Sequence, residues 1–195
     1  MSGKLYLCAT PIGNLEDITL RVLRTLKEVD LIAAEDTRNS IKLLNHFEIH
    51  TPMTSYHEYN KYDKGRELVQ KLLAGTNIAL ITDAGTPGIS DPGEELVARC
   101  AQQGIPVVTI PGPCALVTAL AASGQPTGRF TFEGFLAMNK KNRRAHLDAL
   151  REEERTMIFY EAPHKLQATL KDLCQTFGPD RPVSLCRELT KLHEE

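Results

Sequence analysis

The sequence predicts an α/β protein whose N-terminal part is a mainly parallel sheet covered by helices. Short apolar runs of strand length alternate with segments whose apolar residues recur at helical spacing, which is the pattern of repeated βαβ units. Three of the apolar runs end directly in loops rich in proline and glycine. A second, shorter alternation of the same kind follows residues 123–128, a Gly/Pro-containing stretch that we interpret as a hinge between two domains.

The first domain, residues 1–115, is expected to hold the parallel sheet. The segment at 19–29 shows the basis for predicting its helices: Val22, Leu23 and Leu26 are apolar at helical spacing, whereas the opposite face carries arginine and lysine. The strands are expected near residues 4–10, 30–35, 53–57, 77–82 and 106–110, and the helices near 19–29, 37–47, 61–74, 91–103 and 113–123.

The second domain, residues 116–195, is expected to be a smaller α/β unit. Its strands are expected near residues 130–135, 156–160 and 182–187, and its helices near 141–153 and 163–176. The last residues, 190–195, contain neither a helix stop signal nor an obvious closing strand. We therefore expect the natural chain to continue past Glu195 and the second domain to be incomplete in this chain.

The composition argues against several classes of protein. Of the 195 residues, 42% are hydrophobic, which is enough for a substantial core, and the net charge of −2 does not by itself indicate nucleic-acid binding. The five cysteines are scattered without a Cys-x-x-Cys pair, which favours reduced thiols in a cytoplasm. The histidines are too dispersed for a metal site. From the first residues we expect no signal peptide, and no apolar stretch approaches the roughly 20 residues that span a bilayer.

The most informative segment is residues 82–93, Thr-Asp-Ala-Gly-Thr-Pro-Gly-Ile-Ser-Asp-Pro-Gly, which lies between an apolar run and a predicted helix. Its glycines permit positive φ angles and close approach of a ligand to the backbone, and its prolines stiffen it. At the carboxyl end of a parallel strand, such a loop faces a ligand. The alternative is an ordinary turn in which Asp91 is the N-cap of the following helix.

Residues 10–14 and 111–115 repeat this arrangement, because each follows a predicted strand directly with proline and glycine. The carboxyl ends of parallel strands lie at one edge of a sheet, so the three loops are expected to enclose one elongated ligand. None of them matches the dinucleotide or Walker phosphate motifs, and none contains lysine. This pattern favours a ligand with little negative charge.

Ionisable residues follow two other predicted strands. Glu35, Asp36 and Arg38 end one of them, and His57 ends the other. They are candidates for a role in a cleft, because titratable groups gather at sites of chemistry. The alternative is structural: Asp36 or Thr37 caps the next helix, and Arg38 pairs with a carboxylate.

Two segments of the second domain carry candidate ligand contacts. Residues 139–144 form a dense basic run that would hold phosphates or, alternatively, would be the solvated start of a helix. Tyr160 and Glu161 end a predicted strand and could present a ring and a carboxylate to a ligand. Alternatively, Tyr160 belongs to the core and Glu161 favours the N-terminus of a helix.

Five segments together resemble a known family. They are residues 9–15, 35–38, 55–58, 82–93 and 160–164, and the long 82–93 segment is the specific one. Over essentially its whole length the chain is similar to bacterial small-subunit (16S) ribosomal RNA 2′-O-ribose methyltransferases, within the tetrapyrrole (corrin/porphyrin) methylase superfamily. The resemblance implies the two-domain α/β fold of that superfamily, S-adenosyl-L-methionine held between the domains, a homodimer, and methylation of a cytidine ribose in ribosomal RNA or the assembled small subunit.

The same resemblance, matched position by position, implies which residues contact the cofactor. These are Pro11, Asp83, Ala84, Gly85, Gly88, Cys114, Ala115, Tyr160 and Glu161.

Methyl transfer to a ribose requires the acceptor oxygen, the methyl carbon and the sulfur to be held in line. The hydroxyl is a weak nucleophile and benefits from a nearby base, for which Glu35, Asp36 and His57 are candidates; Arg38 would orient a phosphate or the ribose. The residues expected to contact RNA are Lys140, Lys141, Arg143 and Arg144.

Two other functions stay open from the sequence. One is methylation of a tetrapyrrole intermediate, which the basic run and the Glu35–Arg38 segment disfavour. The other is a non-catalytic protein that binds the cofactor or RNA, which the clustering of ionisable groups at strand ends disfavours.

Overall fold

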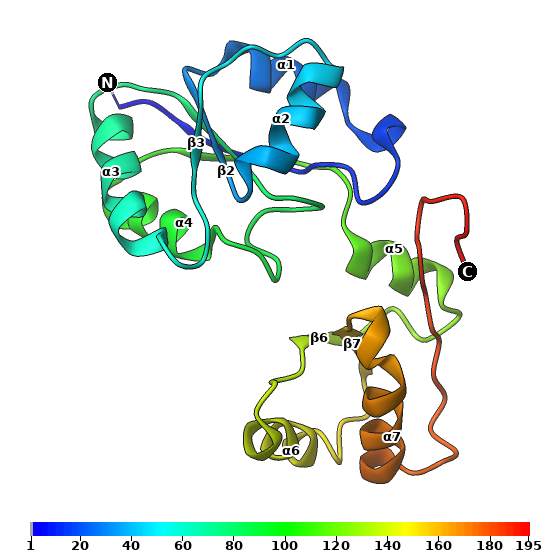
Figure 1. Cartoon of the computed structure of the whole chain (residues 1–195). Helices are drawn as coiled ribbons and strands as arrows, with labels where there is room; N and C mark the ends of the chain where they lie inside the picture. The colour runs from blue at the N-terminus through cyan, green and yellow to red at the C-terminus, as the bar shows by residue number, and fades with distance from the viewer. Residues whose placement is uncertain (1) are drawn as a thin grey trace. The chain divides into compact units, whose positions relative to one another are not determined.

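The computed structural model describes residues 2–195 and divides into two compact units. The first unit extends to Ala115 and includes Thr190–Leu192, and the second comprises Leu116–Leu189 with His193–Glu195 (Figure 1). No helix within residues 2–195 is long and apolar enough to cross a membrane.

The first unit is built on five parallel strands in the order β3-β2-β4-β1-β5. The expected parallel sheet is therefore confirmed. Every residue of the central strand β4 is buried, as expected for a strand that is covered on both faces. The strands are β1 (Leu5–Cys8), β2 (Leu31–Ala34), β3 (Met53–Ser55), β4 (Ile78–Ile81) and β5 (Val107–Ile110).

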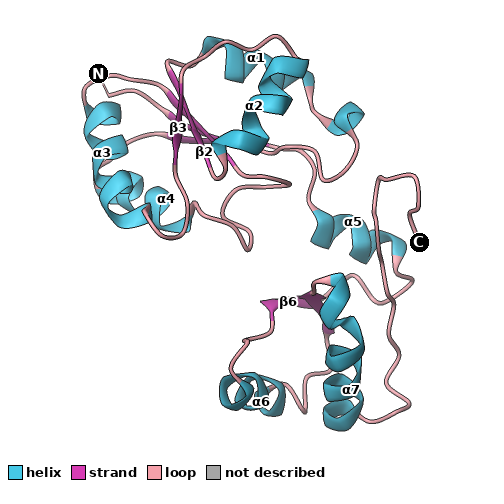
Figure 2. Ribbon diagram, viewed as in Figure 1, coloured by secondary structure: helices cyan, strands magenta, loops and turns pink. Residues whose placement is uncertain are grey.

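Helices cover both faces of this sheet, α1 and α2 on one side and α3 and α4 on the other (Figure 2). Successive side chains of a strand point to opposite faces, so Ala79 and Ile81 of β4 pack with α1 and α2, whereas Ile78 and Leu80 pack with α3 and α4. The helices are α1 (Leu20–Glu28), α2 (Thr37–His46), α3 (Lys61–Leu73) and α4 (Glu94–Gln102), and a short 3-10 turn, η1 (Leu15–Asp17), was not expected.

The strand order places the predicted ligand loops side by side. Strand β1 lies between β4 and β5, so the loops that follow these three strands leave the same edge of the sheet from neighbouring positions. Strand β2 pairs with the other side of β4, which brings the segment after β2 next to the loop after β4. This is the edge where open α/β sheets bind ligands.

The second unit has two parallel strands, β6 (Phe130–Phe135) and β7 (Thr156–Tyr160). Its helices are α5 (Ala115–Ala122), α6 (Lys140–Ala149) and α7 (Leu166–Phe177), the last preceded by a 3-10 turn, η2 (Pro163–Lys165).

The predicted strand at residues 182–187 is wrong, because this segment has no regular structure and lies outside both sheets. Val183 and Leu185 have the alternation of a strand but are 67% and 51% exposed. A strand exists only where a neighbouring strand accepts its backbone hydrogen bonds. Here the backbone pairing is limited to Arg187 with Glu195.

Replacing Leu80 by alanine tests the core of the first unit. Leu80 is fully buried in the central strand. The change should lower the free energy of unfolding by about 3 kcal/mol, because the lost burial adds to the cost of the remaining cavity. Urea denaturation measures this loss. Leu20→Ala is the matched control, because Leu20 is 85% exposed at the start of α1; similar losses in both variants would contradict the packing described.

Candidate functional site

The loops after β1 and β4 are joined directly. The Thr10 amide donates to the Gly85 carbonyl and the Gly85 amide donates to the Thr10 carbonyl, both at 2.9 Å. The Thr10 hydroxyl donates to the Thr82 carbonyl at 3.0 Å, and Thr10 is 1% exposed. These three bonds fix the start of the long loop against the first one.

The loop after β5 joins the same assembly. The Thr86 hydroxyl donates to the Pro113 carbonyl at 3.0 Å. Gly112 lies so close to β1 that a Cβ atom added to it would approach the Cβ of Ala9 to 2.8 Å. The three turns at 10–14, 83–93 and 111–115 therefore converge, as the sequence predicts.

The backbone of the long loop takes conformations that ordinary residues avoid. Gly85 has a φ of 85° and Gly93 a φ of 150°, and a Cβ on Gly93 would approach the Gly88 nitrogen to 3.0 Å. Ser90 has a φ of 60° without being a glycine. Such strained residues collect at ligand sites, where the surrounding structure holds them in place.

Carboxylates from two neighbouring loops meet beside this turn. The Asp83 amide donates to Oε2 of Glu35 at 3.3 Å, and the Asn39 amide group donates to Oδ2 of Asp83 at 3.0 Å. Burial raises the pKa of Glu35, and the nearby charges of Asp83 and Asp36 add to that effect. Glu35 is thus a half-buried carboxylate with increased basicity.

Asp36 and Arg38 follow the structural alternative. Asp36 is the N-cap of α2, where its Oδ1 accepts the Arg38 amide at 2.8 Å. Its carboxylate also binds the Arg38 guanidinium at 2.8 Å. These hydrogen bonds to Arg38 lower the pKa of Asp36 to about 2. The Arg38 side chain is 88% exposed, so its free face remains open to a further anion.

Asp91 lies near Glu35 and Asp83, although the sequence suggested for it only the role of a helix cap. The suggested N-cap role for Asp91 is wrong, because Gly93 occupies the N-cap of α4. Burial, together with the charges of Glu35 and Asp83, raises the pKa of Asp91 to about 6, and no hydrogen bond within the described chain offsets these effects. In the sequence, only the position of Asp91 within the 82–93 segment could have indicated that it belongs with these carboxylates.

Two buried polar atoms near these strand ends lack partners. Oγ1 of Thr82, whose residue is 1% exposed, and Nδ1 of His57 have no hydrogen-bond partner among residues 2–195. The positive form of His57 is close enough to Glu35 to favour the ionised carboxylate. Unsatisfied buried polar atoms at a strand end indicate a place where a ligand or water completes the bonding.

In the second unit, Tyr160 and Glu161 are held in place by their neighbours. The Leu116 amide donates to the Tyr160 hydroxyl at 2.9 Å. Glu161 accepts the Ala162 amide at 2.8 Å through Oε1, and the Thr169 hydroxyl donates to its Oε2. Both residues are half-buried.

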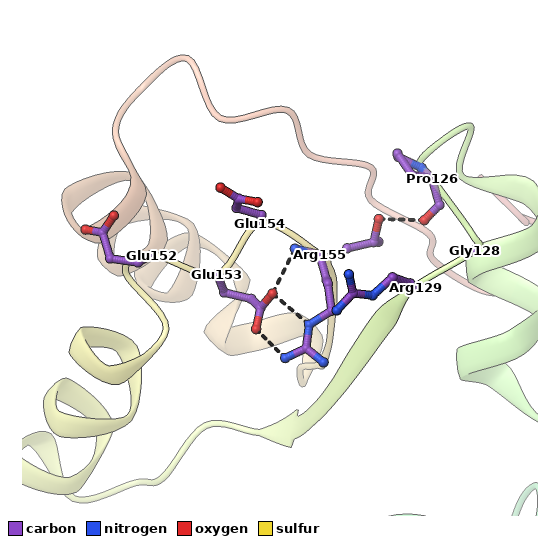
Figure 3. A pocket seen from close by; sticks show the side chains of 8 residues that line it. Pro126, Gly128, Arg129, Glu152, Glu153, Glu154 and Arg155 are labelled. Atoms are coloured by element: carbon purple, nitrogen blue, oxygen red, sulfur yellow. Dashed lines mark hydrogen bonds and ion pairs between the residues drawn. The ribbon is translucent and has the colours of Figure 1, made fainter.

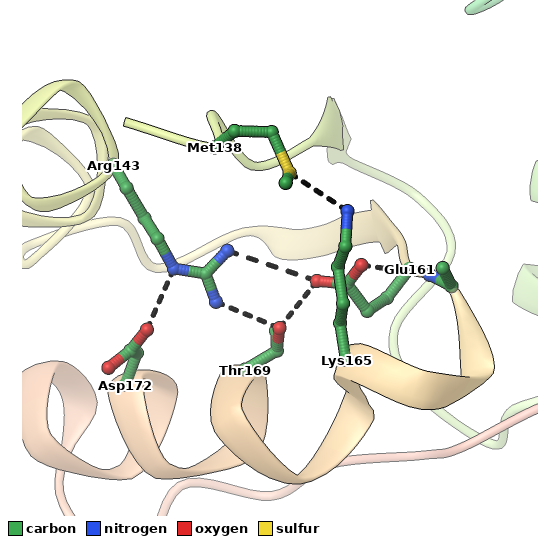
Figure 4. Close-up of polar contacts among 7 residues, drawn as sticks. Met138, Arg143, Glu161, Lys165, Thr169 and Asp172 are labelled. Carbon is green, nitrogen blue, oxygen red and sulfur yellow. Dashed lines mark hydrogen bonds and ion pairs between the residues drawn. The ribbon is translucent and has the colours of Figure 1, made fainter. Parts of the chain in front are cut away.

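The basic run divides into two kinds of residue. Arg143 is tied inward: its guanidinium binds Asp172 at 2.7 Å and the Thr169 hydroxyl at 2.8 Å, lies 3.9 Å from Glu161, and its side chain is only 16% exposed (Figure 4). The others are exposed: Lys140 and Lys141 project from the first turn of α6, and Arg144 pairs with Asp148 at the surface.

An open hollow of about 800 Å³ also lies in the second unit (Figure 3). Glu153 and Arg155 pair within it at 2.6 Å. None of the predicted site residues lines it, and its mixed charge specifies no ligand. Its lining comprises Pro126, Gly128, Arg129 and residues 152–156. Among the described residues, no group of three or more His, Cys, Asp or Glu side chains is placed to hold a metal ion.

A model of the tetrapyrrole (corrin/porphyrin) methylases matches residues 4–195, almost the whole chain. The chain belongs to this family. Within it, the chain is 58% identical to the ribosomal RNA small subunit methyltransferase I of Synechocystis over 193 residues, 99% of this chain and 69% of that protein. Identity to the protein of the same name from Halalkalibacterium halodurans is 57%, over 99% of this chain and 66% of that protein. The chain thus spans about two thirds of the length of these methylases.

Solved structures share the methylase fold. A uroporphyrin-III-C-methyltransferase from Thermus thermophilus superposes with a TM-score of 0.67 at 21% identity, covering 99% of this chain and 83% of that one. A diphthine synthase superposes with a TM-score of 0.68 at 13% identity, covering 89% and 73%. At these identities the likeness concerns the fold alone.

In this methylase, the site formed by the three turns at 10–14, 83–93 and 111–115 fits S-adenosyl-L-methionine. No lysine or arginine lies within the three turns themselves, although the Lys191 side chain packs against Gly13. Glu35, Asp83 and Asp91 instead supply negative charge at the same edge. The unpartnered Oγ1 of Thr82 is available to a polar group of a ligand. This chemistry suits a cofactor whose reactive centre is cationic.

Asp91→Asn should change the pH dependence of stability. Because the folded-state pKa of Asp91 is about 6 against 3.8 for the unfolded chain, ionisation of Asp91 costs stability as the pH rises through this window. The variant should be more stable than the wild type by about 1 kcal/mol at about pH 8, after allowance for screening of a half-exposed group, and the gain should vanish near pH 3.5. Urea unfolding at both pH values measures it. The exposed Asp180→Asn is the control, and a gain independent of pH would contradict the assignment.

Arg143→Ala should destabilise the second unit by about 2 kcal/mol, because it leaves Glu161, whose side chain is only 13% exposed, without its cation and also removes the bond to the partly exposed Asp172. Thermal or urea unfolding measures the loss. The neighbouring Lys141→Ala should change stability by less than about 0.5 kcal/mol, since that side chain is exposed. Equal effects would show that Arg143 has no anchoring role.

Proposed function

We propose that this protein transfers the methyl group of S-adenosyl-L-methionine to the 2′-hydroxyl of a cytidine ribose in small-subunit ribosomal RNA. The observation that carries the proposal is that this chain is 50–58% identical over 193 residues to proteins named ribosomal RNA small subunit methyltransferase I, such as those of Synechocystis and Thermotoga maritima. A related solved structure of uroporphyrin-III C-methyltransferase is a complex with S-adenosyl homocysteine, the demethylated form of this cofactor.

The converging loops support the cofactor contacts that we propose. The turns that join Thr10 to Gly85 and Thr86 to Pro113 carry most of the proposed contacts, and their backbone groups can bind a ligand without adding charge. The carboxylate of Asp83 favours the cationic part of the cofactor. The proposed contacts are Pro11, Asp83, Ala84, Gly85, Gly88, Cys114 and Ala115 in the first unit, and Tyr160 and Glu161 in the second.

The cofactor supplies a methyl group on a positively charged sulfur, and the residues of the chain prepare the acceptor. Glu35 is the base that the electrostatics favour, because its raised pKa makes it a better proton acceptor than Asp36, whose pKa is about 2. Asp36 instead orients Arg38, whose exposed guanidinium can hold a phosphate or the ribose. The positive form of His57, when present, would favour the ionised form of the nearby Glu35 carboxylate.

The RNA side of the proposal rests on the exposed cations of α6. Lys140, Lys141 and Arg144 are at the surface and can contact phosphates, whereas Arg143 anchors the helix that presents them. The acceptor would be ribosomal RNA or the assembled small subunit, and the protein would act as a homodimer. A cytoplasmic location agrees with its five free cysteines.

The deciding experiment incubates the protein with methyl-labelled S-adenosyl-L-methionine and either small ribosomal subunits or a porphyrinoid acceptor. We expect label in the RNA, at the 2′-position of one cytidine, as mapped by nuclease digestion and mass spectrometry. Label in the porphyrinoid alone would replace RNA by a tetrapyrrole as the substrate. A protein that binds the cofactor but labels neither acceptor would be a non-catalytic binder.

Two substitutions separate cofactor binding from catalysis. Gly85→Ala places a Cβ atom on a residue with a φ of 85° and should weaken binding of S-adenosyl homocysteine at least about tenfold, the equivalent of roughly 1.4 kcal/mol of strain, in calorimetry. Glu35→Gln keeps the shape of the side chain and should leave that binding within about twofold, yet lower the methylation rate by about a hundredfold or more, because the base is lost. The site map would be refuted if neither variant changed either quantity.

A further inference from the structure

An exposed aromatic ring ends strand β6. Phe135 is 57% exposed, and its ring contacts Tyr160 edge-to-face with 5.5 Å between centroids. Phe132 contacts the same tyrosine at 5.0 Å. The Tyr160 hydroxyl accepts the Leu116 amide at 2.9 Å, so the ring on which Phe135 rests is itself fixed.

A bulge places Phe135 on this face. Residues three apart in a regular strand point to opposite faces of the sheet, so Phe132 and Phe135 could not both contact Tyr160. The register breaks between Phe132 and Gly134, with Gly134 at a φ of 62°, and Phe135 then lies opposite Tyr160. Bulges of this kind redirect a side chain, often next to a functional site.

Exposed cations follow this ring a few residues further along the chain. Lys140 and Lys141 begin α6 shortly after Phe135 and make no ion pair with any other described residue. Met138, which is 77% exposed, contacts the Lys165 ammonium at 2.8 Å (Figure 4). The carboxylate of Glu161 is occupied by Thr169 and the Ala162 amide and does not neutralise these lysines.

We propose that Phe135 stacks on an unpaired nucleobase of the RNA acceptor while Lys140 and Lys141 contact the phosphates beside that base. The inference rests on the proposed RNA methylation and adds to it the residue that holds a base. An exposed, rigid ring followed closely in the chain by unpaired cations matches single-stranded RNA, which offers a stacking face and a phosphate together. Neither an apolar peptide nor a membrane would require this combination.

The chain contains no tryptophan, so Phe135→Trp introduces a unique fluorescent reporter on the proposed surface. A short single-stranded oligocytidylate should quench its emission on binding, and an abasic ribose-phosphate oligomer of the same length should not. Quenching by both oligomers alike would show contact with phosphate only and would overturn the stacking role. S-adenosyl homocysteine carries an adenine of similar chemistry, and quenching by this compound without quenching by RNA would also overturn it.

Affinity provides the second measurement. Phe135→Leu keeps an apolar side chain but removes the ring, and it should weaken oligocytidylate binding about tenfold at constant salt, whereas Phe135→Trp should retain affinity. Phe130→Leu is the matched control, since Phe130 is 41% exposed at the other end of the same strand and should have no effect. Unchanged melting temperatures establish that the variants are folded.

The outcome distinguishes this inference from the function on which it rests. If the wild type methylates ribosomal RNA and Phe135→Leu binds and methylates RNA as well as the wild type, the stacking role is refuted and the methylation stands. If the wild type transfers no label to RNA and oligocytidylate leaves the tryptophan emission unchanged, both are refuted.

Discussion

The pair of hydrogen bonds between Thr10 and Gly85 is the contact on which the arrangement of the site depends. It closes the loop after β1 onto the loop after β4, at the edge where the neighbouring strands β4, β1 and β5 all end. Because the backbones themselves are paired, the junction of these two loops does not depend on flexible side chains. The Thr86–Pro113 bond then adds the third loop, and the glycine and proline content of all three follows from this close packing.

The electrostatics of this edge differ from those of sites that bind phosphates. Glu35 and Asp91 are partly buried, and burial together with nearby carboxylate charges, including that of the exposed Asp83, raises the pKa of both. Such an arrangement costs stability in the empty protein, and a cationic ligand relieves the cost. Burial and the same charges make Glu35 more basic, so binding of a sulfonium and activation of a hydroxyl can share one cause.

The second unit uses a different means to position its side chains. A bulge at Gly134 directs Phe135 onto Tyr160, and Arg143 holds Glu161 through Thr169 while also binding Asp172. One run of basic residues therefore contains an anchoring arginine and exposed lysines. The anchoring arginine and the exposed lysines carry the same charge, so only their burial distinguishes the two roles. The inward cation stabilises the unit and the outward ones remain free for phosphate.

The sequence by itself determined the alternation of strands and helices, the parallel sheet and the three converging loops, because apolar periodicity and the placement of proline and glycine are local properties. The tertiary structure decided the rest. Residues 182–187 have the alternation of a strand but no strand to pair with, and Asp91 resembles a helix cap but lies before Gly93, which takes that position. Whether Asp36 caps or catalyses, and how strongly Glu35 holds a proton, depend on burial and on charges from distant segments, and no local pattern encodes these.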